Sequence, residues 1–140
     1  MASESQPRVV LVDSNVLLDV ITEDPEWLDW SSRALEDAAE TALLAINPII
    51  FAEVSVRFER IEELDEVLSP TAYTRLPLPW AAGFLAGKCF VRYRRDGGLR
   101  RSPLPDFYIG AHASVGGFAL LTRDATRYSR YFPSLELIAP

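Results

Sequence analysis

Four acidic side chains occur in or beside apolar stretches of this sequence, where a domain ordinarily places no charge. Residues 9–18, 41–56 and 102–122 each carry a single acid in an otherwise uncharged run, and a fourth acid follows shortly after the last run. Carboxylates are rarely buried unless they are paired or bound to a metal. A shared cation site would account for all four, which are Asp13, Glu53, Asp106 and Asp124.

Together these acids favour a hard divalent cation. Two carboxylates about 5 Å apart repel each other by roughly 3 kcal/mol at an effective dielectric of about 20, so a group of four requires a proton or a cation. A donor set of oxygens, without cysteines or paired histidines, favours Mg²⁺ or Mn²⁺ over Zn²⁺. Such an ion can activate water and stabilise a leaving oxygen, and the reaction this implies is phosphodiester hydrolysis.

The four acids act together only if the fold brings them to one place. Apolar strands are expected at 8–12, 42–46 and 118–122, with a last short strand in LELI near the C-terminus. Helices are expected between these strands. This alternation predicts a parallel α/β sheet covered on both faces, whose functional sites form beyond the carboxyl ends of the strands.

Each acid falls near that edge of the predicted sheet. Asp13 follows the first strand and Asp124 follows the third. Glu53 lies in a helix that Asn47 and Pro48 are expected to start immediately after the second strand. Asp106 lies in the first turn of a helix predicted at about 106–115.

Further helices complete the predicted order of elements. Ser14 and Asn15 suit a helix cap after the first strand. The helix that starts at Pro48 is expected to continue as an acidic amphipathic helix to Pro70. Other helices are expected at about 26–40 and 80–95, and a loop at 96–105.

Each acid also has an explanation that needs no metal. Asp13 could cap a helix, and Asp106 could favour a helix N-terminus through the macrodipole. Glu53 could pair with Arg57 four residues later. Asp124 lies between two arginines and could belong to a surface turn. Among other candidates, His112 and Cys89 are expected to pack in the interior and Asp19 to be a solvated helix residue.

Length and composition indicate one domain. At 140 residues the chain can form its own core, and we expect one compact domain at 8–140 after a disordered lead-in at 1–7. A single cysteine excludes an intrachain disulfide, and no apolar run is long enough for a membrane span. The N-terminus lacks the order of a signal peptide. These features predict a cytoplasmic protein without membrane contact.

Charge is distributed unevenly along the chain. The net charge is −6, but residues 1–69 hold 16 acids and 4 bases, whereas residues 70–140 hold 4 acids and 10 bases. A basic stretch with interleaved aromatic residues runs into Asp106, and such a stretch can neutralise phosphates and stack on unpaired bases. A solvated or partner-binding basic surface is the alternative. The basic residues are Lys88, Arg92, Arg94, Arg95, Arg100 and Arg101.

Four motifs in this order and spacing resemble a PIN-domain ribonuclease, and most of all the VapC-type toxins of toxin–antitoxin pairs. They are VDSNVLLD, NPIIFAEV, PDFYIGAHA and LLTRDATRYSRYFPSLELIAP. The resemblance covers about 8–140 and implies a three-layer α/β/α sandwich around a parallel sheet. It implies a Mg²⁺- or Mn²⁺-dependent endoribonuclease that acts on RNA with unpaired segments. It also implies a homodimer and a cognate antitoxin that inhibits the enzyme.

The same resemblance assigns roles to single residues. The four acids would form the catalytic site, with three of them as metal ligands, namely Asp13, Asp106 and Asp124. Ser14, Asn15 and Thr122 would position the acids. Two departures from the family pattern stand out: the basic 80–105 region matches no motif, and the strongly acidic character of the N-terminal half has no counterpart in the pattern.

Three other functions fit parts of the pattern. A catalytically silent PIN-like module that binds RNA or protein would keep the fold without the metal, and a housekeeping PIN nuclease would lack the antitoxin. A receiver-type phosphoacceptor domain also has an acid pocket at strand ends. That class requires a lysine after a late strand, whereas the one lysine of this chain, Lys88, falls in a predicted helix.

Overall fold

A computed structural model describes residues 7–98 and 104–140 of the chain. Most of the lead-in predicted at 1–7 and part of the loop predicted at 96–105 therefore lie outside the described residues, as do Arg100 and Arg101. Within the described ranges, no helix is both long and apolar enough to cross a bilayer.

The described residues form one five-stranded sheet in which all pairings are parallel. The strand order is β3-β2-β1-β4-β5. The strands are β1 (Arg8–Val12), β2 (Ala42–Ile46), β3 (Thr74–Arg75), β4 (Ala119–Leu121) and β5 (Leu137–Ile138). The apolar runs RVVLV, ALLAI and FALLT thus form the predicted strands, because a parallel sheet covered on both faces needs continuous apolar sequence.

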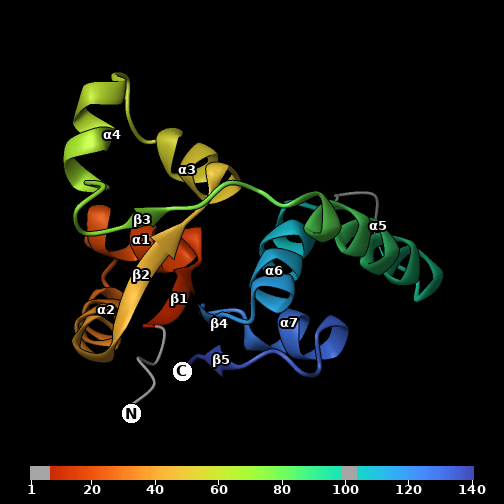
Figure 1. Cartoon of the computed structure of the whole chain (residues 1–140). Coiled ribbons are helices and arrows are strands. Elements are labelled where there is room, and N and C mark those ends of the chain that lie inside the picture. The colour runs from red at the N-terminus through yellow and green to blue at the C-terminus, as the bar shows by residue number, and fades with distance from the viewer. Residues whose placement is uncertain (1–6, 99–103) are drawn as a thin grey trace, which may run out of the picture.

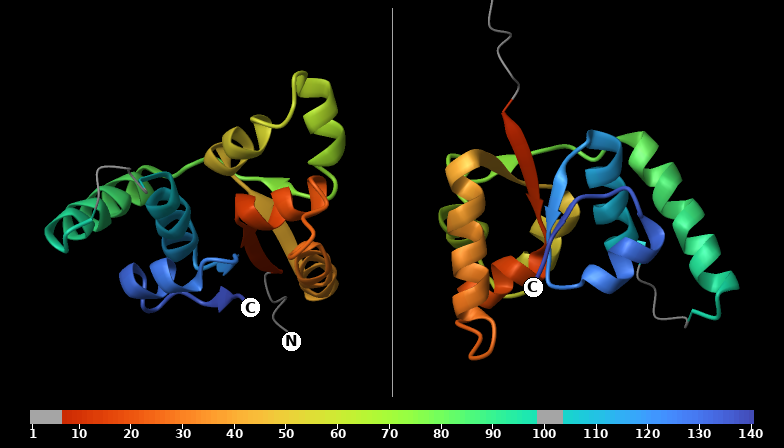
Figure 2. Two further views of the ribbon diagram at one scale, coloured as in Figure 1. Left: turned by 180° about the vertical axis from the view of Figure 1, so that it is seen from behind. Right: turned by 90° about the horizontal axis from the view of Figure 1, so that it is seen from below.

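Helices cover both faces of this sheet, which makes the predicted three-layer sandwich (Figures 1 and 2). α1 and α2 pack together on one face, and α3 and α6 lie on the other. α5 packs along the outer side of α6, away from the strands (Figure 1). The helices are α1 (Ser14–Ile21), α2 (Leu28–Thr41), α3 (Pro48–Ser55), α4 (Ile61–Val67), α5 (Trp80–Arg95), α6 (Leu104–Gly116) and α7 (Ala125–Tyr131).

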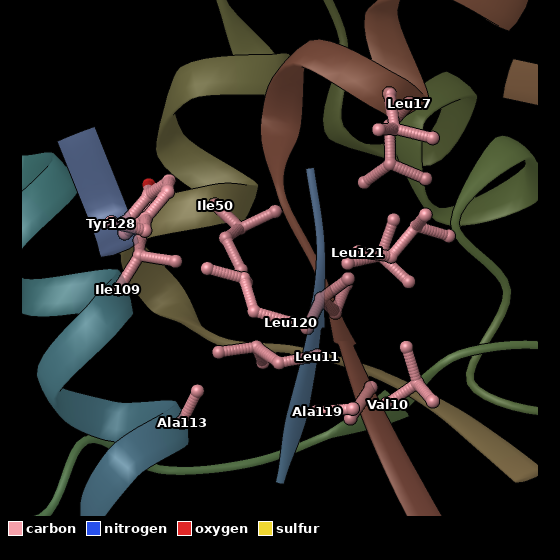
Figure 3. Close-up of a cluster of buried hydrophobic side chains, with 14 of the residues drawn as sticks. Val10, Leu11, Leu17, Ile50, Ile109, Ala113, Ala119, Leu120, Leu121 and Tyr128 are labelled. Atoms are coloured by element: carbon pink, nitrogen blue, oxygen red, sulfur yellow. The ribbon is translucent and has the colours of Figure 1, made fainter. Parts of the chain in front are cut away.

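Alternate residues of the two central strands build the two halves of the core. Leu11 and Leu120, which are register partners, face Ile50, Ile109 and other apolar side chains of α3, α6 and α7 (Figure 3). The intervening residues of β1 and β4 face the opposite side, where Leu17 of α1 lies (Figure 3). Strand residues and helices are thereby fixed in register, since a shift by one residue would exchange the two faces.

The order of the strands reverses between β1 and β4, and the region beyond the carboxyl ends of these two strands is called the β1/β4 crevice. From β1 the chain moves outward to β2 and β3, and it then returns to the other side of β1 to form β4 and β5. In open α/β sheets, ligands bind beyond the carboxyl ends of the strands where the order reverses in this way. Asp13 follows β1 directly, and Thr122 follows β4 directly.

Two local predictions differ from the structure. The helix that starts at Pro48 does not continue to Pro70; α3 ends at Ser55, whose Oγ donates to the Ala52 carbonyl, and α4 begins separately at Ile61. The cap of α1 is Asp13 rather than Ser14 or Asn15, because the Asp13 carboxylate accepts the Ser14 amide at 2.8 Å.

Asn47 joins the two helices that carry Glu53 and Asp106. Its Oδ1 accepts the Ile50 amide at 2.9 Å and so caps α3, while its Nδ2 lies 3.0 Å from Nδ1 of His112 in α6. Asn47 and His112 are both buried, at 2% and 3% exposure. The side chain predicted as a simple helix cap therefore also sets the distance between α3 and α6.

Replacing Asn47 with Ala should lower the free energy of unfolding by about 1–3 kcal/mol, because it removes a cap and leaves a buried imidazole nitrogen without its partner. Urea denaturation measures the change. Ser55→Ala removes an exposed hydroxyl from the same helix and should change stability by less than about 0.5 kcal/mol. Equal effects of the two substitutions would contradict the bridging role of Asn47.

Candidate active site

Asp13 is the buried centre of the site. Its side chain is 3% exposed, and both carboxylate oxygens accept hydrogen bonds. Oδ1 accepts the Ser14 amide, and Oδ2 accepts Thr122 Oγ1 at 2.8 Å and the Tyr128 hydroxyl at 3.1 Å. The donors come from α1, from the end of β4 and from α7. The carboxylate thus ties both sides of the crevice together.

Glu53 faces Asp13 from α3. Ser14 Oγ donates to Glu53 Oε1 at 3.0 Å, so the hydroxyl beside the first acid also orients the second. The ion pair with Arg57 that the spacing allowed does not form among the described residues, because α3 ends before Arg57 and that side chain lies in the following turn. Glu53 is half-buried, and its position reflects the site rather than a helix ion pair.

Asp106 and Asp124 meet around Arg127. The Arg127 Nη1 donates to Asp106 Oδ2 and lies 3.9 Å from Asp124 Oδ2. Asp124 also caps α7 by accepting the Arg127 amide at 3.4 Å. The sequence associated Arg127 with Asp124 alone, but Asp106 is its nearer partner although 21 residues separate them.

The polar residues assigned by resemblance lie among the acids. Thr122 is fully buried, and its Oγ1 donates to Asp13 while accepting the Asp124 amide at 3.0 Å. Asn15 accepts the Arg123 amide at 3.3 Å and places Nδ2 3.4 Å from Thr122 Oγ1. These contacts link the backbone after β4 to the start of α1.

Tyr128 was not expected from the sequence to take part in the site. It is 1% exposed and, with Phe132, packs against Gly110 of α6, where a Cβ would lie 2.5 Å from Phe132 Cε2 and 3.0 Å from Tyr128 Cδ1. Burial, with the nearby Asp13 and Asp106 carboxylates, raises the pKa of Tyr128 well above its usual value. The phenol therefore keeps its proton and remains a donor. Its position in α7, four residues after Asp124, is the only signal in the sequence.

The environment of Asp19 was predicted wrongly from the sequence. It is not solvated but 3% exposed, and it accepts Arg123 Nε at 2.7 Å, Arg123 Nη2 at 3.0 Å and Ser31 Oγ at 2.6 Å. The Arg123 guanidinium also lies 5.0 Å from the centre of the Trp27 ring. This two-pronged pair is the geometry that arginine favours with a carboxylate, and it clamps the segment between Thr122 and Asp124 onto α1 and α2.

Burial and mutual repulsion dominate the electrostatics of the site. Burial and, to a smaller extent, the nearby Asp106 carboxylate together raise the pKa of Asp13 to about 6, against the lowering effect of the hydrogen bond from Thr122. Burial also raises the pKa of Glu53 against the opposing bond from Ser14, with Asp13 and Asp106 adding to the rise. The pKa of Asp106 is raised by burial and lowered by Arg127. The acids therefore sense one another, as a common anionic site requires.

The donor chemistry of the site fits a hard divalent cation, although the side chains are not arranged around one. All the acids offer oxygen, and half-buried or buried carboxylates are the ligands that Mg²⁺ and Mn²⁺ prefer. Across residues 7–98 and 104–140, however, no three acidic, histidine or cysteine side chains stand close enough to hold one ion. Asp106 is directed to Arg127, so an ion bound by Asp106 and the other acids would require this carboxylate to turn.

The basic stretch lies on α5, beyond α6 as seen from the sheet (Figure 1). Lys88, Arg92, Arg94 and Arg95 are exposed there. Some of the interleaved aromatic residues are not available for stacking on bases: Phe107 is fully buried, and Tyr93 packs edge-on against it with ring centres 5.5 Å apart. Phe90 is partly buried with Arg94 above its ring.

Comparison with protein families identifies the fold. The profile of the PIN domain matches residues 10–131. The chain belongs to the PIN-domain family. The match spans Asp13, Glu53, Asp106 and Asp124, so the acids of the crevice are acids of a PIN domain. A comparison with curated protein sequences gave no match.

Solved structures share this PIN-domain fold at low identity. A chain in the crystal structure of VapBC2 from Rickettsia felis, bound to a DNA fragment from their promoter, is 19% identical with a TM-score of 0.70, covering 94% of this chain and 98% of that one. A chain of a toxin-antitoxin complex from Klebsiella pneumoniae is 22% identical with a TM-score of 0.66, covering 92% of this chain and 95% of that one. A chain of FitAcB from Neisseria gonorrhoeae is 18% identical with a TM-score of 0.61, covering 92% of this chain and 96% of that one.

The raised pKa of Asp13 predicts how the metal-free PIN domain responds to pH. In the folded protein the Asp13 carboxyl keeps its proton up to about pH 6, whereas in the unfolded chain it loses the proton near pH 3.8. The free energy of unfolding therefore falls as the pH rises between those two values. The loss is of the order of 3 kcal/mol. In EDTA, Asp13→Asn should therefore be more stable than the parent at neutral pH, with a gap that closes in acid.

Thermal unfolding at several pH values measures this gap. Asp65→Asn provides the matched control, because Asp65 pairs with Arg75 on the exposed side of α4. Because Asp65→Asn removes an exposed ion pair, this variant should not be more stable than the parent at neutral pH. A constant difference between Asp13→Asn and the parent across the range would contradict the buried, protonated Asp13.

Proposed function

We propose that this PIN domain is a Mg²⁺- or Mn²⁺-dependent endoribonuclease and the toxin of a toxin–antitoxin pair. The observation that carries the proposal is the meeting of four PIN-domain acids at the β1/β4 crevice, with Asp13 buried in a network of three hydrogen bonds. The likeness in fold to chains of VapBC2 and of a toxin-antitoxin complex supports the toxin assignment.

In this proposal Asp13, Asp106 and Asp124 would hold the ion, which would supply Lewis acidity at the scissile phosphodiester. Glu53 takes the proton of the attacking water as the new bond to phosphorus forms and the bond to the leaving oxygen breaks. The leaving oxygen takes a proton from solvent. The raised pKa of Glu53 suits it to accept a proton near neutral pH. Ser14 holds the Glu53 carboxylate toward the crevice.

The exposed cations of α5 are proposed to bind the RNA backbone. These cations share one helix that contains no acid before Asp96, and they are Lys88, Arg92, Arg94 and Arg95. RNA with unpaired segments would extend from this helix toward α6. Arg100 and Arg101, at residues outside the described ranges, would extend the same charge. Phosphate contacts of this kind give affinity without sequence preference.

Two protein partners belong to the proposal. A cognate antitoxin would inhibit the enzyme, and an arginine from such a partner would suit the anionic crevice. The domain would form a homodimer in the cytoplasm, as the resemblance to VapC-type toxins implies.

A catalytically silent module is the second candidate. It is favoured by one observation, that no three potential ligands stand together among the described residues. A silent module would bind RNA with unchanged affinity in the presence of EDTA and would not bind Mn²⁺.

Replacing Asp13 or Asp106 with Asn should reduce Mg²⁺-dependent RNA cleavage at least about 100-fold, because each change removes a charged ligand. Cleavage of a fluorescently labelled RNA measures the rate, and circular dichroism checks the fold. Asp65→Asn is the matched control and should cleave at the parental rate. Undiminished cleavage by both site variants would rule out the proposed active site.

Changing the four α5 cations to Gln should weaken RNA binding and flatten its dependence on salt, because fewer neutralised phosphates release fewer counterions when the complex forms. Fluorescence anisotropy in Ca²⁺ at several salt concentrations measures both quantities. Arg8 pairs with Glu136 at the amino end of the sheet, so replacing it with Gln should leave the dependence of RNA affinity on salt concentration unchanged. Equal slopes for the parent and the α5 variant would exclude this helix from the RNA interface.

A further inference from the structure

The side chain of Arg127 stands where a cation of the site would stand. Its Nη1 donates to Asp106 Oδ2 and lies 3.9 Å from Asp124 Oδ2, so one guanidinium contacts two of the three proposed metal ligands. The side chain is 34% exposed, and those of Asp106 and Asp124 are 29% and 44% exposed. The contact is open to solvent on one side, which allows the guanidinium to leave.

The other nearby arginine does not take this position. Arg123 is two-pronged on Asp19 and stacks on Trp27, on the far side of the segment after β4. Among the described ion pairs, those that involve the four acids of the crevice come from Arg127. Arg127 is therefore the charge that offsets the repulsion among these acids.

The pairing also determines how the acids are oriented. Asp106 Oδ2 is occupied by a guanidinium N–H, and among the described residues the acids do not converge on one point. A divalent ion that used this oxygen of Asp106 would have to displace Arg127 from it. Two ligands that compete for one group reduce each other's affinity by the same factor.

We propose that Arg127 is an internal counter-ion that holds Asp106 in the metal-free protein and must release it before a divalent cation binds. Arg127 thereby sets the concentration of metal at which the site fills. This inference rests on the metal site of the proposed function and adds to it a residue that opposes metal binding. It also describes an idle state of the site that exists in the isolated chain, without any partner.

The size of the effect follows from the paired fraction. When a competent state is populated only in part, the apparent affinity falls by that fraction. If Arg127 holds Asp106 in about nine molecules of ten, its removal tightens metal binding about tenfold. A residue that merely stabilised the fold would leave metal affinity unchanged.

The test is a titration of the metal-free, full-length protein with Mn²⁺, followed by the electron paramagnetic resonance signal of the free ion. No RNA is present, so the measurement does not depend on catalysis. Arg127→Gln should bind Mn²⁺ about tenfold more tightly than the parent. Arg130→Gln is the matched control, because Arg130 lies on the same helix but pairs with Asp96, and its Mn²⁺ affinity should equal that of the parent.

Arg127→Lys gives a second variant that keeps the charge. A lysine lacks the planar N–H fork of arginine and pairs less specifically with a carboxylate, so this variant should bind Mn²⁺ with an affinity between those of the parent and Arg127→Gln. If Arg127→Gln does not fold, the Lys variant decides the question. Circular dichroism establishes which variants are folded.

Unchanged or weaker Mn²⁺ binding in the folded Arg127 variants would overturn this inference and leave the proposed metal site standing. If neither the parent nor any variant binds Mn²⁺, the metal site itself fails and the inference fails with it. Tighter binding in Arg127→Gln, with no change in Arg130→Gln, is the result that supports a competing guanidinium.

Discussion

Burial of one carboxylate, that of Asp13, is the constraint on which the arrangement of the crevice depends. The end of β1 places this acid beside β4 at the point where the strand order reverses, with 3% of its side chain exposed. An ionised group in that position needs hydrogen-bond donors on both oxygens. Ser14, Thr122 and Tyr128 supply them, and each belongs to a different part of the chain. The same contacts that make burial tolerable therefore align α1, β4 and α7.

The remaining acids surround this centre under mutual repulsion. Burial and the neighbouring carboxylates raise the pKa of Asp13, Glu53 and Asp106, and Arg127 partly opposes the rise at Asp106. Charge gathered in this way lowers stability, as functional sites commonly do. The clamp of Arg123 on Asp19 and the bridge from Asn47 to His112 hold the helices at the site in place against that repulsion.

The sequence predicted the elements well because strands and helices of a doubly covered sheet leave local signals. RVVLV and ALLAI are continuous apolar runs, and Asn47 followed by Pro48 is a helix start whose cap the structure contains. The break between α3 and α4 was missed, since no glycine or proline marks the turn at residues 56–60.

Side-chain partners that are distant in the chain could not be predicted in the same way. Asp106 and Arg127 are 21 residues apart, and Tyr128 reaches Asp13 across 115. Asp19 looked like a solvated helix residue because its partner, Arg123, lies on another element. The placement of the four acids near the carboxyl ends of β1 and β4 could be predicted from strand ends, whereas the contacts that orient each carboxylate depend on tertiary packing.

A crystal structure of the Mn²⁺-soaked protein would establish whether these acids form one divalent-cation site. We expect an anomalous scattering peak in the β1/β4 crevice, with oxygens of Asp13 and Asp106 within about 2.3 Å of the ion. A crevice with no peak at saturating Mn²⁺, or a peak bound by other residues, would show that these acids do not form such a site.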